Sequence, residues 1–326
     1  MNVGILGAGN IAGTMAETIR MMASDGEDVS LYAIGSRSER KAQSFAMKNG
    51  VARAYSSYED LLRDPNVDLV YIATPHSEHY INMLLCLNFN KPVLCEKSFT
   101  ANADQARKIT TLAELKKIPL AEAIWTRYMP MRKIINDVLS SGAIGTPRTI
   151  TANLSYNVYK NDRLHRPDLA GGALLDVGVY PINFAEMIFD HADGVSATAV
   201  MSEDGVDETD SITLTWDDGR VAVLTAGIKA ISDRSGVIYG DEGYAVVENI
   251  NNPDRIRIYD LSRENVKTIE APDRLNGYEY EIREMHRIIE EEKTECPSMP
   301  HDESVHIMEV MDHIRAQIGY KFPFES

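Results

Sequence analysis

The chain has 326 residues, 44% of them hydrophobic, and a formal net charge of −16. This length favours two domains, because single hydrophobic cores stop growing near roughly 250 to 300 residues. The excess of acidic residues, 49 against 33 basic ones, repels a phosphate backbone and argues against a nucleic-acid partner. The apolar runs fall short of the ~20 residues that span a bilayer, and no secretion signal precedes the first strand-like segment. We therefore expect a cytoplasmic protein without a membrane partner.

The first 120 residues alternate between apolar, β-rich runs and helix-like stretches. Strands are predicted at 3–6, 29–34, 69–73, 93–95 and 119–121, and helices at 11–23, 37–48, 58–63, 78–87 and 103–116. Such alternation is typical of right-handed βαβ units with a parallel sheet covered on both faces. We predict a Rossmann-type, doubly wound dinucleotide-binding domain over residues 1–122.

The pattern changes after a predicted helix at 131–141. Strands then dominate, at 148–156, 196–201, 211–216, 220–226, 236–239, 245–248 and 255–260, and "WDDGR" at 216–220 has hairpin-turn chemistry. One helix interrupts the strands at 171–189, and two more follow at 278–292 and 303–318. The fold class is therefore α/β for the first domain, followed by an α+β domain over 123–326 with a large, mostly antiparallel open sheet. We expect that second domain to bind substrate and to support oligomerisation.

The first strand runs directly into the glycine pattern of "VGILGAGNIA". Gly7, Gly9 and Ala12 have the G-x-G-x-x-G/A spacing, which combines a tight turn, a close approach to a pyrophosphate and close packing of helix on strand. The next helix begins at Asn10 and Ile11, whose backbone N–H groups can bind phosphate. We predict a dinucleotide site made by these five residues.

The end of the second strand indicates which dinucleotide is bound. An acid there would favour NAD through the ribose 2′-hydroxyl, whereas an arginine accommodates the 2′-phosphate of NADP. The sequence is "GSRSERK", with Ser36 and Arg37 and no acid before Glu39. We therefore predict NADP, with NAD less favoured.

The cysteines and histidines do not indicate a metal centre. Cys86, Cys95 and Cys296 form no CxxC pair, so we expect buried, reduced thiols. His76 and His79 are three residues apart, but no third ligand lies near them in the sequence. We expect no metal ion.

Ligands of open parallel sheets bind outside the carboxyl ends of the strands. Two segments, "ATPHSEH" and "VLCEKSFT", end predicted strands there. We place Thr74, Pro75 and His79 around the nicotinamide ribose, with Glu96 and Lys97 at the same cleft.

Four motifs in order, "GAGNIA", "ATPHSEH", "CEKS" and "GGALLDVGVYPIN", resemble those of the Gfo/Idh/MocA oxidoreductases over essentially the whole chain. The family carries a catalytic lysine in an E-K-P stretch and a D-x-G-x-H/Y stretch on a helix of the second domain. The matching residues are Lys97 and the series Asp176, Gly178 and Tyr180. The tyrosine resembles the branch that contains dimeric dihydrodiol dehydrogenase and NADP-dependent D-xylose dehydrogenase.

The resemblance implies a hydride transfer between nicotinamide and a carbinol carbon of a sugar, polyol or cyclic diol. Asp176 and Tyr180 are four apart on a predicted helix and share one face. A tyrosine can exchange the hydroxyl proton if its pKa, near 10 when free, is lowered, and a lysine cation does this. We assign Tyr180 as acid/base, Lys97 as its electrostatic partner, and Asp176 as an orienting group.

One departure from the family pattern concerns Ser98, which stands where proline usually follows the lysine. The family's prolyl bond is commonly cis, so the sequence leaves open whether the Lys97–Ser98 bond is cis or trans. Trp125, Arg127 and His165 are further candidates for the substrate pocket, although packing or surface roles are as well supported for them.

The alternative function is a dinucleotide-binding regulator without catalysis, which this family resemblance also includes. The presence of Lys97, Asp176 and Tyr180 together favours the enzyme. We also expect a homo-oligomer, formed through the open sheet of the second domain.

Overall fold

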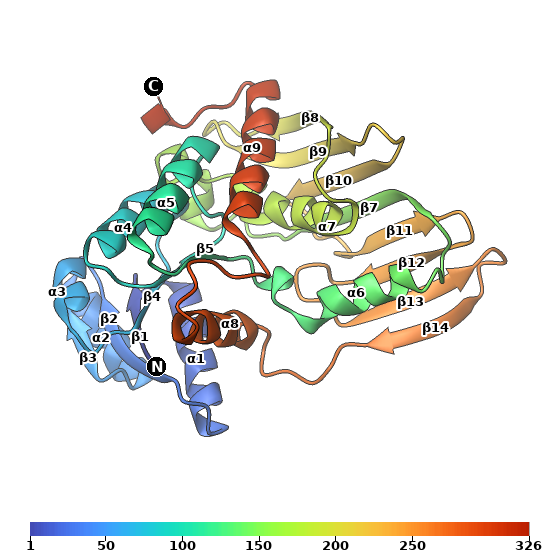
Figure 1. Cartoon of the computed structure of the whole chain (residues 1–326). Coiled ribbons are helices and arrows are strands. Elements are labelled where there is room, and N and C mark those ends of the chain that lie inside the picture. Colours follow the sequence, from blue (N-terminus) through green and yellow to red (C-terminus); the bar gives the residue numbers. More distant parts are fainter. Residues whose placement is uncertain (326) are drawn as a thin grey trace. The chain divides into compact units, whose positions relative to one another are not determined.

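Strands and helices alternate through the first 123 residues of the computed structural model, which describes residues 1–325 (Figure 1). The strands form one parallel sheet in the order β3-β2-β1-β4-β5-β6. This order reverses between β1 and β4, the position where such folds bind ligands. The elements are β1 (Asn2–Leu6), α1 (Asn10–Ser24), β2 (Ser30–Gly35), α2 (Glu39–Asn49), β3 (Arg53–Tyr55), α3 (Tyr58–Arg63), β4 (Leu69–Ile72), α4 (His76–Asn88), β5 (Val93–Glu96), α5 (Ala103–Lys116) and β6 (Leu120–Ala123).

A second sheet follows, in the order β14-β13-β12-β11-β7-β10-β9-β8, and only its β7–β10 pair is parallel. Its long strands alternate buried and exposed residues, so one face packs on a core and the other is open. The elements are η1 (Trp125–Arg127), α6 (Pro130–Ser140), β7 (Pro147–Ser155), η2 (Asp162–His165), η3 (Pro167–Leu169), η4 (Leu174–Gly178), α7 (Val179–Phe189), β8 (Gly194–Met201), β9 (Asp207–Thr215), β10 (Val221–Gly227), β11 (Gly236–Gly240), β12 (Gly243–Glu248), β13 (Arg255–Asp260), β14 (Asn265–Glu270), α8 (Glu279–Glu290), α9 (His301–Gln317) and η5 (Pro323–Glu325).

The chain divides into two compact units, and the division differs from the predicted one at 122/123. The first unit comprises residues 1–125 and 274–305, and the second comprises 126–273 and 306–326. Residues 274–305 return to the first unit because Arg283 of α8 forms two hydrogen bonds with Glu27, at 2.7 and 3.0 Å, and Leu120 N donates to Thr294 O at 2.9 Å. The sequence contains no local signal for this return, since it depends on pairing between distant segments.

Two strands were not predicted, β3 and β14. β3 has only three residues, and β14 is an edge strand with nearly every residue exposed. Neither shows the alternation of buried and exposed residues that makes a strand visible in a sequence. The predicted Asp-Gly hairpin is confirmed: Gly219 has φ of 90° and joins β9 to the antiparallel β10.

One stretch, Pro167–Phe189, is long and apolar enough to cross a membrane by length and composition, although the sequence analysis found no such run. The most apolar 18 residues of this stretch are 83% buried inside the fold, as is typical of a helix in the core of a globular unit. The three cysteines are buried and form no disulfide within residues 1–325. Burial raises the pKa of the Cys86 and Cys95 thiols, which keeps them protonated.

Candidate active site

The glycine turn after β1 has the geometry that a dinucleotide requires. Gly7 has φ of +98°, and a Cβ on it would lie 2.6 Å from the Ala73 carbonyl oxygen, so no larger residue fits. A Cβ on Gly9 would meet no described atom within 4 Å, which leaves this side of the turn open. Gly9 precedes α1 without a capping side chain, so the first N–H groups of the helix, from Asn10 and Ile11, are available to an anion. These residues therefore fit a dinucleotide pyrophosphate.

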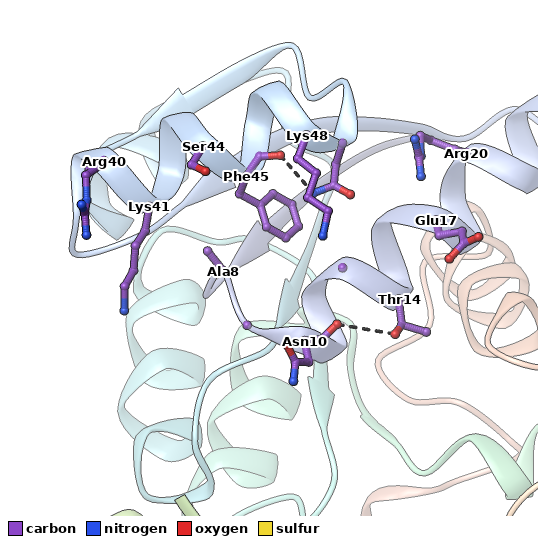
Figure 2. Close-up of a pocket in the computed structure, with 13 residues that line it drawn as sticks. Ala8, Asn10, Thr14, Glu17, Arg20, Arg40, Lys41, Ser44, Phe45 and Lys48 are labelled. Atoms are coloured by element: carbon purple, nitrogen blue, oxygen red, sulfur yellow. Dashed lines mark hydrogen bonds between the residues drawn. The ribbon is translucent and has the colours of Figure 1, made fainter. Parts of the chain in front are cut away.

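Two cavities border this turn. The smaller, of about 310 Å³, is lined by Ser36, Arg37, Lys41, Thr74 and Pro75 together with the glycines. The larger, of about 780 Å³, lies between the turn, α1 and α2 (Figure 2). Its charged lining residues are Glu17, Arg20, Arg40, Lys41 and Lys48. The first cavity contains the predicted cofactor residues, and cations predominate in the second.

Lys41 lines both cavities and was missed in the sequence analysis. It lies in the first turn of α2, and its backbone N donates to the Oγ of the N-cap Ser38 at 3.4 Å. Arg37 is 71% exposed and lies 3.5 Å from Glu78 Oε2, while Ser36 is buried. The run of cationic residues after β2 is visible in the sequence, but only the cavity linings show which of these side chains lie beside the glycine turn.

His79 joins the carboxyl ends of β4 and β5. Its ring is fully buried, with Nδ1 at 2.9 Å from the Ser98 carbonyl oxygen and Nε2 at 2.9 Å from that of Thr74. Thr74 Oγ1 also accepts from Asn82 Nδ2 at 3.0 Å. His79 therefore positions two residues at the strand ends, and the cofactor contact predicted for it stays a prediction.

Lys97 follows a fully buried strand and is itself only half-buried. Its peptide bond to Ser98 is cis, which answers the question that the sequence left open. The backbone N of Lys97 donates to Glu96 Oε2 at 3.2 Å, and the Tyr71 hydroxyl donates to Glu96 Oε1. The buried Glu96 side chain thus bonds to the backbone of Lys97 and fixes the start of the segment that carries this lysine.

A second buried acid, Glu281 on α8, lies near Glu96. Burial, and then the charge of Glu96, raise the pKa of Glu281 well above its usual value. Burial and Glu96 also raise the pKa of Tyr71. Both shifts favour the neutral, protonated forms of Glu281 and Tyr71.

In the second unit, Asp176 lies in the wide π-turn η4 and Tyr180 in the first turn of α7. Asp176 forms an ion pair with Arg163 Nη2 at 2.7 Å, and the Tyr180 side chain is largely buried. Arg163, from η2, was not singled out in the sequence. The partnership of Lys97 with Tyr180 joins residues of different units and stays a prediction.

Two of the three candidates for the substrate pocket, Trp125 and Arg127, contact identified side chains. Trp125 stacks on Tyr278 with ring centres 4.1 Å apart. Arg127 is buried, and its Nε donates to Asn183 Oδ1 at 2.7 Å. These contacts position η1 and α7, and the roles of both residues in substrate binding stay predictions.

His165 is held at both ring nitrogens. Nδ1 lies 3.1 Å from Asp204 Oδ2, and Nε2 contacts the Tyr159 carbonyl oxygen. Its predicted contact with substrate likewise stays a prediction.

A group with ligand atoms suited to a metal lies elsewhere, at Glu186, His191 and His306. The two imidazole rings stack at 3.7 Å with planes 15° apart, and His306 Nε2 lies 3.1 Å from Glu186 Oε2. A metal lies near the plane of each imidazole that binds it, and two parallel stacked planes cannot both contain one ion. We therefore interpret the group as a hydrogen-bonded Glu186–His306 pair with His191 stacked on His306.

A parallel sheet with an open glycine turn, and a second unit that presents an aspartate and a tyrosine on one helical segment, define the class as a dinucleotide-binding oxidoreductase. Comparison with family models agrees. The model of the Gfo/Idh/MocA oxidoreductase family with an NAD-binding Rossmann fold matches residues 1–123, and the model of the family's C-terminal domain matches residues 133–246. The chain belongs to the Gfo/Idh/MocA family.

Individual relatives match over nearly their full length. The chain is 32% identical to trans-1,2-dihydrobenzene-1,2-diol dehydrogenase of Mus musculus, covering 98% of this chain and 97% of that protein. It is 32% identical to D-xylose 1-dehydrogenase (NADP(+)) of Hypocrea jecorina, covering 98% and 92%. A 3-ketoreductase from Actinomadura kijaniata, solved with NADP and TDP-benzene, shares the fold at a TM-score of 0.88, with 23% identity and 97% of each chain covered.

Proposed function

We propose that the protein is an NADP-dependent oxidoreductase that acts on a carbinol carbon of a sugar, polyol or cyclic diol. The observation that carries this proposal is the combination of the open, cation-lined glycine turn with Asp176 and Tyr180 on a single segment. The relatives named for a dihydrodiol and for xylose support the substrate class. Turnover of NADP with a panel of aldoses, inositols and trans-dihydrodiols tests the proposal.

Bound NADP would supply the hydride acceptor or donor. The Tyr180 phenolate takes the hydroxyl proton as the substrate is oxidised, and the resulting phenol returns it during reduction. The Lys97 ammonium supplies the positive charge that favours the phenolate. Asp176, paired with Arg163, orients the substrate hydroxyls.

Lys41 and Arg37 are proposed to bind the 2′-phosphate of NADP. Replacing either by alanine should weaken NADPH binding by about 10- to 100-fold and NADH binding much less, because a hydrogen bond to a charged group contributes about 1.5–3 kcal/mol. Dissociation constants for both cofactors, measured by fluorescence, check this. Lys48→Ala is the matched control, since Lys48 lines only the larger cavity. Equal losses for NADH and NADPH in the Arg37 and Lys41 variants would contradict the assignment.

We also propose a homodimer through the open face of the second sheet. Val223 on β10, an interior strand of that sheet, is 42% exposed, and Tyr239, Tyr244 and Tyr259 form a row of aromatic rings across three neighbouring strands. An apolar and aromatic surface of this kind is typical of interfaces.

Sedimentation at micromolar concentration should show a dimer for the wild type and a monomer for Val223→Glu. Ile231→Glu changes an exposed residue outside the strands and should remain dimeric. A monomeric wild type would remove this part of the proposal. The three buried cysteines form no disulfide among residues 1–325, which is compatible with a reducing compartment, and we propose a cytoplasmic location.

A further inference from the structure

Two buried aspartates lie beneath the segment that carries Asp176 and Tyr180. Asp207 and Asp210, both on β9, are 1% and 0% exposed. The Asp207 Oδ2 accepts a hydrogen bond from the backbone N of Leu174 at 2.5 Å. Leu174 is the first residue of η4, two positions before Asp176. A side chain from the sheet therefore caps the start of this helical segment, in place of a local N-cap residue.

The fit between Asp207 and the chain that enters η4 is tight. A Cβ on Gly172 would lie 2.1 Å from Asp207 Oδ1, so the carboxylate occupies the space that a side chain would need. Gly172 has φ of +110°, and its backbone N donates to the Leu164 carbonyl oxygen at 3.0 Å. Further along, a Cβ on Gly178 would lie 3.5 Å from Ala226 Cβ, so the turn packs directly on the sheet. Both ends of η4 are thus fixed to the inner face of the sheet.

The two aspartates differ in ionisation. Burial, and then the charge of Asp207, raise the pKa of Asp210 well above its usual value. Burial also raises the pKa of Asp207, but the backbone N–H groups of Leu174 and Ala173 oppose this effect. Two adjacent buried carboxyls are not both ionised, because their charges repel each other. The carboxyl that accepts hydrogen bonds from N–H groups is the one that is ionised, because those bonds stabilise its charged form. Asp210 therefore retains its proton, and Asp207 places a negative charge at the helix start, where the helix dipole favours it.

Tyr320 completes the surroundings of the pair. It is buried, and its hydroxyl makes no hydrogen bond among residues 1–325. Burial, and then the charge of Asp207, raise its pKa, so it also remains neutral. Asp207 is therefore the one member of this cluster that both carries charge and bonds to η4.

We propose that Asp207 is a positioning residue for the reaction, because its carboxylate fixes the start of η4 and thereby sets the places of Asp176 and Tyr180. The inference rests on the proposed function of those two residues. A misplacement of about 1 Å in an active site can cost 10²-fold in rate. Asp207 touches neither reactant in this proposal and acts only through the backbone of the helical segment.

The test compares Asp207→Asn with Asp210→Asn. In Asp207→Asn the charge is lost and an amide NH₂ can face the N–H groups of Leu174 and Ala173, so kcat should fall by about 10- to 100-fold. The dissociation constant for NADPH should not change, since the glycine turn belongs to the other unit. Asp210→Asn replaces one neutral group by another of the same shape that can still donate, and should retain kcat within about threefold. Equal losses in the two variants, or an unchanged kcat in Asp207→Asn, would overturn the proposal.

Two further measurements separate positioning from general damage. In the Tyr180→Phe background, Asp207→Asn should lower the residual rate by a smaller factor than it lowers the wild-type rate, because only the placement of Asp176 still matters there and residues that act as a unit are not additive. A full additional loss would mean that Asp207 acts by another route. Amide hydrogen exchange over residues 173–180 should be at least about tenfold faster in Asp207→Asn than in Asp210→Asn. This second readout needs no turnover, so it tests the positioning role even if the substrate panel fails and the proposed function with it.

Discussion

The Tyr180→Phe variant is expected to lose about 10²- to 10⁴-fold in kcat while it binds NADP as tightly as the wild type. The substitution removes only the phenolic oxygen, which is the group that exchanges the proton, and general acid–base groups contribute rate factors of this size. The ring remains, so the packing of the first turn of α7 should be preserved. Steady-state kinetics with the best substrate of the panel, together with cofactor titration, measure both quantities.

A matched control is Tyr280→Phe, which removes a hydroxyl from a tyrosine of α8 that lies beside Arg283, outside the second sheet. Its kcat should equal that of the wild type. If Tyr180→Phe also keeps wild-type turnover, Tyr180 has no part in the mechanism. If the wild type itself binds NADPH but turns over no substrate, the alternative of a dinucleotide-binding regulator gains weight.

The Lys97→Met variant is expected to lose turnover to a comparable degree. Methionine keeps the length and apolar stem of the side chain but removes the charge that favours a phenolate. The pH at which oxidation accelerates should therefore move upward in the variant, because without the cation the tyrosine releases its proton less readily. A pH–rate profile of wild type and variant measures this displacement.

Lys108→Met provides the control, since Lys108 is exposed on α5 and pairs only with the nearby Asp104 among residues 1–325. It should leave both the rate and the pH profile unchanged. A Lys97→Met protein with a lower rate but an unshifted profile would show that Lys97 contributes to substrate binding and not to the ionisation of Tyr180.

Most elements of the fold could be predicted from the sequence, because their signals are local. The helices α3 and α5 and the strand β13 have the predicted bounds, and the Asp-Gly turn between β9 and β10 occurs where its residues require it. The glycine turn after β1 was equally visible, since Gly7 and Gly9 sit between a buried strand and a helix start. The spacing of hydrophobic residues and the residue preferences of turns both depend on only a few neighbouring residues of the chain.

The candidate site was only partly predictable. The sequence pointed to Asp176 and Tyr180, but not to Arg163, which reaches Asp176 from a separate 3₁₀ turn. It pointed to Arg37, but not to Lys41 as a residue facing the glycine turn. In both cases the missed residue comes close to the site only in the folded chain, and residue type alone does not predict which side chains come together.

The sequence by itself determined the parallel and antiparallel halves of the protein, the glycine turn, and the residues able to carry acid–base chemistry, because each depends on a short run of neighbours. Only the tertiary structure decided that residues 274–305 rejoin the first unit, that His79 joins Thr74 to Ser98, and that Asp207 holds the start of η4. These contacts link segments far apart in the chain, and burying their polar groups is unfavourable unless each group finds the partner that only the folded chain provides.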